Sequence, residues 1–487
     1  MLVTIDREPG GAPLHRQIYG SLRAAILEGR LAAGSRLPGS RVLADDLGVS
    51  RTTILSAYDQ LTVEGYIVGK GGGGTRVATV ARAPAARTGR WGKSTPVRLS
   101  VLGARMIAAY GDLPPRPQAD RPVPFALGEP ALDAFPAALW ARLIARRWRD
   151  TPRAMLAPDD GPGHAPLREA IAEYVVAARA VRCTPDQIVI TAGTQQGIDL
   201  IVRLLLNPGD TAWVEEFGYP PMRAALAGVG AQLIEVPVDA EGLDVARGRQ
   251  LAPAARLALV TPSFEAPLGV AMSLRRRLGL LEWAHQTGAW IIEDDYNGEL
   301  RYEGKPLAAL QGLEHPGARR VIYLRTFSRT LFPALRLGYA VLPQELVEPF
   351  TRARLVADRH SPTAEQAVLA DFIARGHFAA HIRTMRELYA ARQRTFLDLA
   401  TRELGELLQV RAAPAGMHLV GWLPPGVSDR RVAAAAARRG VMVEPLSHRR
   451  PSPSAAPGLI LGYVAFHADE TRRALGELAA AIRSVSR

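Results

Sequence analysis

From residue 98 to the C-terminus, short apolar runs alternate with stretches of helical periodicity. The runs QIVIT, TAWVEE, LALVT, AWIIEDDY and RVIYLRTF are apolar along most of their length rather than at every second position. Such runs are typical of parallel strands covered on both faces, and their alternation with helices is typical of an α/β fold. We therefore predict that residues 98–487 form a large α/β domain, with a mostly parallel sheet flanked by helices and a smaller C-terminal α/β lobe.

Residues 1–78 show a different pattern and are expected to form a separate unit. Apolar residues recur at every fourth position from Leu14 to Ile26, which predicts an amphipathic helix. A second helix is expected to begin with Ser40 as its N-cap, and a third, RTTILSAYDQLTVEG, with Ser50 as its N-cap. Two short β segments around the glycines at 71–74 then predict a hairpin. Three helices followed by a hairpin is the order of a winged helix-turn-helix.

Residues 79–97, between these two units, are interpreted as a linker because they are rich in small, basic and proline residues and lack hydrophobic periodicity. The whole chain carries 60 Lys and Arg against 47 Asp and Glu, a net charge of +13. This surplus favours a polyanionic partner or phosphate-bearing ligands. Only Lys70, Lys93 and Lys305 are lysines, which limits the candidates for any chemistry that needs an amine.

Two features bear on the compartment. Cys183 is the only cysteine, which rules out a disulfide within the chain and is typical of a reducing environment. No apolar run is as long as a membrane-spanning helix, which needs about 20 residues. The first residues, MLVTIDREPGG, lack the apolar segment of a signal peptide. We therefore expect a cytoplasmic protein with no membrane partner.

The stretch LPGSRVLADDLGVSRTTILSAYDQLTVEGYIVGKGGGGTRVA resembles the winged helix-turn-helix of GntR-type transcription regulators. In such a unit the first residues of the recognition helix enter the major groove, and an arginine there can make bidentate contacts to guanine. A capped helix with one arginine, or a glycine run, is more often structural when it occurs alone. Together they predict a double-stranded DNA operator as partner, with Arg41, Ser50, Arg51, Thr52, Thr53, Lys70 and the wing-tip Gly72 as the DNA-binding residues.

Residues 98–487 resemble fold-type I aminotransferases, and with the GntR-type head the chain resembles the MocR subfamily of regulators. In TAGTQQGIDL a helix begins directly after a predicted strand, so backbone amides at its start can bind a phosphate. The resemblance implies pyridoxal phosphate (PLP) as the cofactor. Each motif alone would more often be structural, but their order predicts the aminotransferase fold. The residues implied are Gly193, Thr194 and Gln195 at the helix start, Tyr219 and Asp294 at the ring, Tyr296 at the 3-oxygen, and Thr326, Ser328 and Arg336 in the phosphate cup.

One position departs decisively from the aminotransferase pattern. Where the family has the lysine that forms a Schiff base with PLP, this chain has Arg329. A guanidinium stays protonated and is a poor imine-forming nucleophile, so we expect no catalytic residue at this site. Lys305, in the loop YEGKP, is the only lysine of this domain. Ile460 and Ala266 also replace residues that aminotransferases use for the substrate carboxylate and for the ring. We predict no metal site.

Three functions therefore remain open. The chain is a regulator that senses PLP, or a related phosphate-bearing or amino-acid-related small molecule, without a covalent bond. Alternatively, its second domain has lost the cofactor and serves for dimerisation or for another effector. The third function, an active aminotransferase, is the least favoured because of Arg329. The retained pocket residues favour the first, and the resemblance implies a homodimer.

Overall fold

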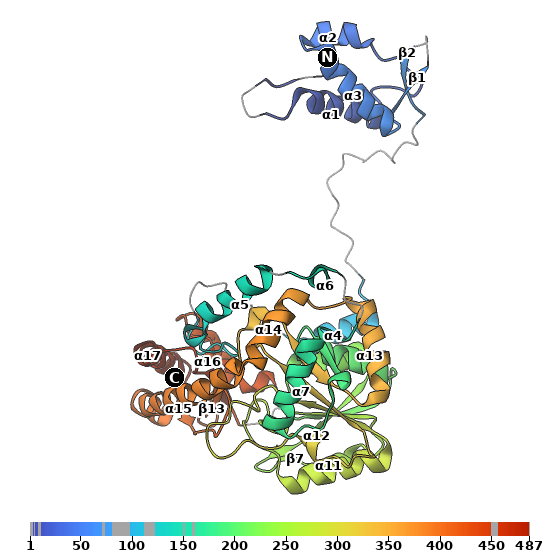
Figure 1. Ribbon diagram of the computed structural model, residues 1–487. Coiled ribbons are helices and arrows are strands. Elements are labelled where there is room, and N and C mark those ends of the chain that lie inside the picture. The colour runs from blue at the N-terminus through green and yellow to red at the C-terminus, as the bar shows by residue number, and fades with distance from the viewer. Residues whose placement is uncertain are drawn as a thin grey trace. The chain divides into compact units, whose positions relative to one another are not determined.

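The computed structural model describes Val3 and residues 5–7, 11–70, 74–79, 98–111, 122–149, 151–157, 161–449 and 456–486. The chain divides into two compact units, Met1–Arg98 and Leu99–Arg487 (Figure 1).

The N-terminal unit consists of three helices followed by a β-hairpin, as the sequence predicts. Its core contains Ile18 and Leu22 from the first helix and Ile54, Tyr58 and Leu61 from the third, which pack together and exclude water. The hairpin strands pair antiparallel, from Ile67 opposite Val77 to Lys70 opposite Gly74. The elements are α1 (Leu14–Leu27), α2 (Ser40–Leu47), α3 (Arg51–Val63), β1 (Ile67–Lys70) and β2 (Gly74–Val77).

The predicted N-cap is confirmed for α3 and wrong for α2. Ser50 caps α3, because its hydroxyl accepts a hydrogen bond of 3.1 Å from the backbone N–H of Thr53. The prediction that Ser40 caps α2 is wrong: Gly39 is the N-cap, in an extended conformation, and Ser40 is the first helical residue. Glycine is also common at N-caps, so the sequence Gly39-Ser40 is compatible with either residue as the N-cap of α2.

The large unit is built on a seven-stranded sheet with the order β3-β11-β10-β9-β8-β4-β5. All neighbouring strands are parallel except at β11, which runs antiparallel to both β10 and β3. The α/β prediction is therefore confirmed. The strands are β3 (Ile188–Thr191), β4 (Thr211–Glu215), β5 (Gln232–Val236), β8 (Leu257–Val260), β9 (Trp290–Asp294), β10 (Val321–Thr326) and β11 (Gly338–Val341).

Helices cover both faces of this sheet (Figure 1). Alternate strand residues point to opposite faces, so Ile322 packs with α8 and α9 while its neighbours Val321 and Tyr323 pack on the other side. On that other side Trp213 of β4 stacks on Trp283, with ring centroids 3.9 Å apart and planes within 16°. One face carries α8 (Thr194–Leu205), α9 (Pro220–Gly228) and α13 (Gln344–Ala357); the other carries α5 (Ala137–Arg149), α7 (Ala165–Arg179), α10 (Val245–Leu251), α11 (Leu274–Thr287) and α14 (Thr363–Ala374).

A smaller lobe follows, as predicted, and has a four-stranded antiparallel sheet in the order β12-β13-β15-β14. Its strands are β12 (Gln409–Val410), β13 (His418–Trp422), β14 (Glu444–Pro445) and β15 (Gly458–Gly462), and its helices are α15 (His377–Leu404), α16 (Asp429–Ala437) and α17 (Ala468–Val485). The remaining α-helices and strands of the large unit are α6 (Arg153–Leu156), α12 (Leu310–Leu313), β6 (Val238–Asp239), β7 (Gly242–Leu243) and α4 (Val101–Tyr110). The helix α4 packs on α9.

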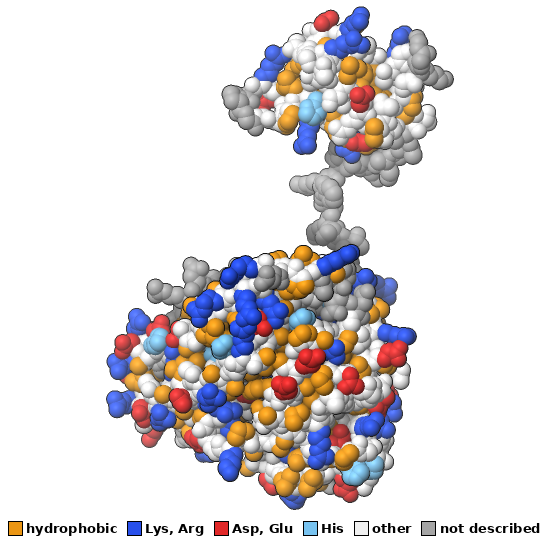
Figure 2. Space-filling view, viewed as in Figure 1, with side chains coloured by type: hydrophobic (Ala, Val, Ile, Leu, Met, Phe, Trp, Pro, Cys, Tyr) orange, Lys and Arg blue, Asp and Glu red, His pale blue; other side chains and the backbone are white. Residues whose placement is uncertain are grey.

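The surface of the large unit mixes both signs of charge, with arginines gathered over α5 (Figure 2). This helix carries Arg142, Arg146, Arg147 and Arg149, of which Arg147 pairs with Asp371 of α14 at 2.7 Å. In the part of the chain that the structure describes, no helix is both long and apolar enough to cross a membrane.

Candidate functional site

A cavity of about 210 Å³ lies where the carboxyl ends of the large-sheet strands meet the smaller lobe. Asp294 ends β9, Thr326 ends β10, and Thr261 directly follows β8, while Met417 and His418 reach the cavity from the smaller lobe. In open α/β sheets this edge is the usual place for a ligand, because the loops that leave the strands diverge there.

The structure brings the predicted cofactor residues together around this cavity. They come from segments more than a hundred residues apart in the sequence, yet all of them line one space. These residues are Gly193, Thr194, Gln195, Tyr219, Asp294, Tyr296, Thr326, Ser328 and Arg336, and Arg329 joins them.

One region of the cavity has the composition of a phosphate site. The helix α8 begins after Gly193, and no side chain of the described residues caps it. Its first residues, Thr194 and Gln195, line the cavity, so the positive end of the helix dipole and the first backbone N–H groups lie at this end of it. A Cβ atom on Gly193 would lie 3.5 Å from the Arg336 guanidinium and 3.7 Å from Oγ1 of Thr326, which shows how closely these groups approach. Arg336 also donates to the carbonyl of Ala192 at 2.7 Å. We name Gly193, Thr194, Thr326, Ser328 and Arg336 the phosphate region.

A second region contains groups suited to a heteroaromatic ring. Burial, and next the charge of Asp295, raise the pKa of Asp294 to about 8, so that its carboxyl is largely protonated at neutral pH. Burial also raises the pKa of the Tyr296 hydroxyl. The guanidinium of Arg449 lies over the ring of Tyr219, 5.6 Å from its centroid.

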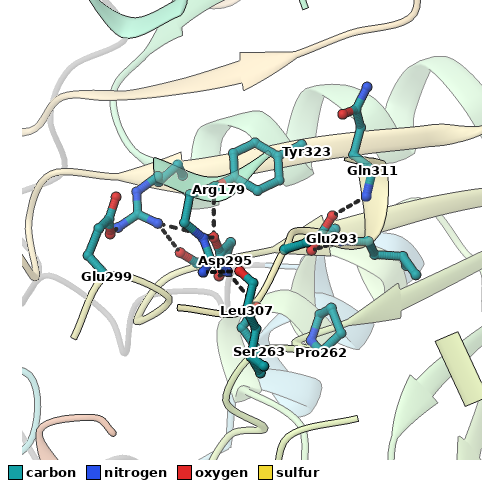
Figure 3. A network of polar contacts seen from close by, with 12 residues as sticks. Arg179, Pro262, Ser263, Glu293, Asp295, Glu299, Leu307, Gln311 and Tyr323 are labelled. Atoms are coloured by element: carbon teal, nitrogen blue, oxygen red, sulfur yellow. Dashed lines mark hydrogen bonds and ion pairs between the residues drawn. The ribbon is translucent and has the colours of Figure 1, made fainter. Parts of the chain in front are cut away.

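Behind Asp294, a buried ionic network fixes the end of β9 (Figure 3). Asp295 accepts hydrogen bonds from Arg179 at 2.8 Å and from the Tyr323 hydroxyl at 2.7 Å, and Arg325 also bonds to it. Burial alone would raise the pKa of Asp295, but the charges of Arg179 and Arg325 lower it to about 2. Asp295 is therefore a permanent anion, and its charge helps to keep the neighbouring Asp294 protonated.

Arg329, which the resemblance places where aminotransferases have their lysine, lines the cavity. Its guanidinium lies against Gly128, where an added Cβ would overlap Nη1, and Gly128 has a φ of +83°. Lys305 is exposed in the loop after Arg301 and is not among the described residues that line the cavity.

Several residues that line the cavity have no counterpart in the sequence prediction. Arg449, 7% exposed, donates to both carboxylate oxygens of Glu444, at 2.6 and 3.0 Å. His418 has its Nε2 atom 3.0 Å from the carbonyl oxygen of Pro267, and burial, with the charge of Arg449, lowers its pKa to about 3. No local pattern marks these positions, because Arg449 is one arginine in an arginine-rich chain and the cavity reaches it only through the fold. The other residues that line the cavity and that the sequence analysis did not name are Leu127, Gly128, Met222, Thr261, Asn297, Pro333 and Met417.

The residues present fit a PLP-type ligand. Within the described residues, four that line the cavity have a buried polar atom without a hydrogen-bond partner: Oδ1 of Asp294, the hydroxyl of Tyr296, Oδ1 of Asn297 and Oγ of Ser328. A buried polar atom without a partner is costly, so native structures rarely keep several in one place unless a ligand or water satisfies them. The resemblance assigns Asp294, Tyr296 and Ser328 to the ring nitrogen, the 3-oxygen and the phosphate.

The other predicted site is the start of α3. Arg41, Ser50, Arg51 and Thr52 are exposed, and Thr53 is half-buried. The Nε atom of Arg51 donates to the hydroxyl of Ser40 at 3.3 Å, which places the N-termini of α2 and α3 side by side. Lys70 is the last residue of β1, and Gly72 lies outside the described residues.

Comparison with known proteins gives two family matches. The family described as bacterial regulatory proteins, gntR family, matches residues 14–77, and aminotransferase class I and II matches residues 133–453. Among solved structures, the α-aminoadipate aminotransferase LysN of Thermus thermophilus is similar with a TM-score of 0.69 and 27% identity, covering 75% of this chain and 92% of that one.

Full-length relatives combine both domains. The chain is 40% identical over 480 residues to a protein of Rhizobium meliloti named as probable rhizopine catabolism regulatory protein MocR, with 99% of this chain and 96% of the relative covered. It is 31% identical over 484 residues to the HTH-type pyridoxine biosynthesis transcriptional regulator PdxR of Corynebacterium glutamicum, covering 98% and 97%.

The fold and these matches define a transcription regulator in which a GntR-type winged helix is joined to an aminotransferase-like domain. The similarity to the Rhizobium regulator extends over nearly the whole of both chains. The chain belongs to the MocR family of GntR-type regulators.

Proposed function

We propose that this MocR-family regulator binds a DNA operator through the start of α3 and senses PLP, or a closely related phosphate-bearing or amino-acid-related small molecule, without a covalent bond. One observation carries the ligand part. Polar atoms expected to contact PLP are still buried and unsatisfied around the cavity, whereas Arg329 stands in place of the lysine. A domain that had lost its ligand would be expected to fill such a cavity with apolar side chains, because unsatisfied polar groups destabilise the fold.

The proposal assigns a role to each part of the chain. Residues 1–78 bind DNA, residues 79–97 act as a linker, and residues 98–487 bind the effector and form a homodimer. In the DNA-binding unit, the arginine and hydroxyl groups at the start of α3 read base edges and phosphates, and the wing approaches the neighbouring groove. The residues assigned to DNA are Arg41, Ser50, Arg51, Thr52, Thr53, Lys70 and Gly72.

In the cavity, each group has a binding task. The phosphate region holds a dianionic phosphate through backbone N–H groups, hydroxyls and the Arg336 guanidinium, which are charge-assisted donors. Gln195 lines the same end, where its side-chain amide donates to the carbonyl of Pro221 at 2.9 Å. Asp294 brings its own proton, which it shares with a pyridine nitrogen, and the Tyr296 hydroxyl donates to a ring oxygen. Tyr219 contacts the ring. Bound PLP supplies an electron-withdrawing ring and an aldehyde.

Arg329 determines that the ligand is held reversibly. Its protonated guanidinium cannot provide the nucleophilic amine, so retention depends on hydrogen bonds and ion pairs alone. We therefore propose that the domain is a sensor and does not carry out transamination.

The experiment is an absorbance titration of the full-length protein with PLP, followed by borohydride treatment, peptide mass mapping and dialysis. We expect saturable binding, no pyridoxyl adduct on any residue, and complete loss of the ligand on dialysis. Absence of saturable binding up to millimolar PLP would favour the alternative, a domain used for dimerisation or another effector. A reducible adduct in the native protein would contradict noncovalent binding and direct attention to Lys305.

A further inference from the structure

The helix α5 carries three exposed arginines and no acidic residue. Arg142, Arg146 and Arg149 are exposed, whereas Arg147 is half-buried and pairs with Asp371 of α14 at 2.7 Å. None of the 13 residues of α5 is an Asp or a Glu. Figure 2 shows arginine side chains gathered over this helix. We name Arg142, Arg146 and Arg149 the arginine stripe.

The spacing of the arginine stripe places its side chains along one face of α5. Residues four and seven positions apart lie on the same face of an α-helix, so the stripe extends over about 10 Å along the helix axis. A different side of the helix holds Trp140 and Leu143, which are buried in the core of the large unit. Trp140 packs edge-on against Phe372 of α14, with ring centroids 5.4 Å apart. The stripe is therefore presented to solvent from a helix that is anchored in the core.

The arginine stripe keeps its charge available for a partner outside the chain. Among the described residues, neither Arg142 nor Arg146 forms an ion pair or a side-chain hydrogen bond, and Arg149 donates only within its own helix, to the carbonyl of Ala145 at 3.4 Å. Asp150, the next residue of the chain, lies outside the described residues. A cation in the last turn of a helix is favoured by the helix dipole, which accounts for Arg146 and Arg149. It does not account for Arg142, in the middle of α5.

Double-stranded DNA is the partner whose charge and spacing match the arginine stripe. Each strand of B-DNA carries one phosphate per about 3.4 Å of helix axis, so the stripe can lie beside about three phosphates of one strand. Guanidinium N–H groups form charge-assisted and often bidentate hydrogen bonds with phosphate oxygens. Residues 14–77 match the gntR family of regulatory proteins, and DNA bound by that unit is held close to the large unit because both belong to one polypeptide.

We propose that the arginine stripe of α5 is a second DNA-contacting surface, which binds the phosphate backbone of the duplex whose bases are read by the start of α3. This inference rests on the proposed DNA binding and goes further by assigning part of it to the large unit. Contacts to phosphates carry no sequence information, so the stripe strengthens binding to all duplexes by a similar factor.

The test measures how the DNA affinity of the full-length protein depends on salt. The stripe variant combines Arg142→Gln, Arg146→Gln and Arg149→Gln. Fluorescence anisotropy over a series of salt concentrations gives the dissociation constants for an operator duplex selected by the native protein and for an unrelated duplex. We expect the slope of log Kd against log salt concentration to fall by about two to three, because each lost phosphate contact lowers it by about one. The affinities for both duplexes should fall by the same factor.

Further variants assign this effect to the arginine stripe. The matched control combines Arg383→Gln, Arg394→Gln and Arg402→Gln, at three exposed positions of α15, and removes the same charge from the same unit. Its salt slope should equal that of the native protein. Three lysines in place of the stripe keep the charge and should keep most of the slope. If the stripe variant does not fold, Arg142→Gln alone leaves the last turn of α5 intact and should lower the slope by about one.

The outcomes separate the two proposals. If the stripe variant keeps the native salt slope, or if it and the α15 control lose the same amount, the second surface is overturned while DNA binding through α3 stands. A stripe variant that loses the preference for the operator also overturns it, because that loss belongs to base contacts. If the native protein binds neither duplex at low salt, the proposed DNA binding is overturned and the inference with it.

Discussion

At the scale of single residues, the proposed function depends most on Arg329. It lines the same cavity as the phosphate region and Asp294, and Gly128, which has no side chain, leaves room for the guanidinium. A lysine is shorter and less bulky than an arginine, so the same space accepts it.

Arg329→Lys is therefore expected to produce a yellow species with added PLP, together with a borohydride-stable pyridoxyl adduct on residue 329. A lowered lysine pKa is favoured in a buried cavity that already contains guanidinium groups, which increases the fraction of reactive amine. The measurement is an absorbance scan before and after reduction, with peptide mapping. Arg329→Gln, which lacks an amine, is the control and should give no adduct. A colourless Arg329→Lys protein in excess PLP would show that the cavity has changed at more than one position.

Asp294 gives a second residue-scale prediction, on pH dependence. Its pKa in the folded protein is raised to about 8, so between the ordinary aspartate value and pH 8 the folded state binds more protons than the unfolded state. The contribution of Asp294 to the free energy of unfolding therefore falls as pH rises across this window and levels off above pH 8.

Asp294→Asn is neutral at every pH and removes this contribution. Urea unfolding of the large unit, followed from pH 5 to 8, should show the native protein losing stability relative to the variant, by roughly 1–3 kcal/mol. Another buried carboxyl, Glu293, is common to both proteins and cancels in the difference. A difference that is constant with pH, or that grows in the opposite sense, would contradict a protonated Asp294.

At the scale of elements, the start of α3 is held by its own residues. The Ser50 cap fixes the helix start, and the contact between Arg51 and Ser40 ties α3 to α2. The exposed side chains of the first turn are thus presented from a rigid support.

We expect Arg51→Ala to weaken operator binding by about 1–3 kcal/mol and to relax the preference for operator over unrelated DNA. Fluorescence anisotropy at fixed salt measures both, with a duplex selected from random DNA by the native full-length protein as the probe. Arg30→Ala is the control, because Arg30 is an exposed arginine of the same unit that pairs with Glu28 away from α3. Equal loss in both variants would mean that only general charge, and not the first turn of α3, supports binding.

How far the sequence predicts each element depends on how local its signal is. The apolar runs locate β3, β4, β8, β9 and β10, because a strand covered on both faces is apolar along its own length. The antiparallel direction of β11 depends on pairing with strands distant in sequence, and no local pattern contains it. The same holds in the cavity: Asp294 and Thr326 follow recognisable strands, whereas His418 and Arg449 reach it only because the smaller lobe folds against the carboxyl edge of the sheet.

At the scale of the whole molecule, we infer that α4 contributes a surface to the proposed homodimer. One side of this helix packs on α9, yet it exposes Val101 (70%) and Ile107 (56%), and Leu99 and Tyr110 are also exposed. A row of large apolar side chains on one short helix is typical of a surface that is covered in an assembly. Two DNA-binding units on one homodimer would then require an operator with two half-sites.

The double variant Val101→Glu and Ile107→Glu is expected to shift the protein from dimer to monomer, because charged side chains resist burial in an apolar interface. Sedimentation velocity at micromolar concentration measures the change. Leu274→Glu, at a 60% exposed position of α11, is the control and should leave the sedimentation coefficient unchanged. A native protein that sediments as a monomer at this concentration would contradict the proposed homodimer.

The stacked indoles of Trp213 and Trp283 give the large unit an optical signature. Two nearly parallel indoles with centroids 3.9 Å apart couple their electronic transitions, so the folded chain should show an exciton couplet in its circular dichroism spectrum that disappears once β4 and α11 separate. Neither tryptophan belongs to the described lining of the cavity, and residues 1–78 contain no tryptophan. The couplet therefore reports the integrity of the large unit alone, and allows its unfolding to be followed separately from that of the DNA-binding unit.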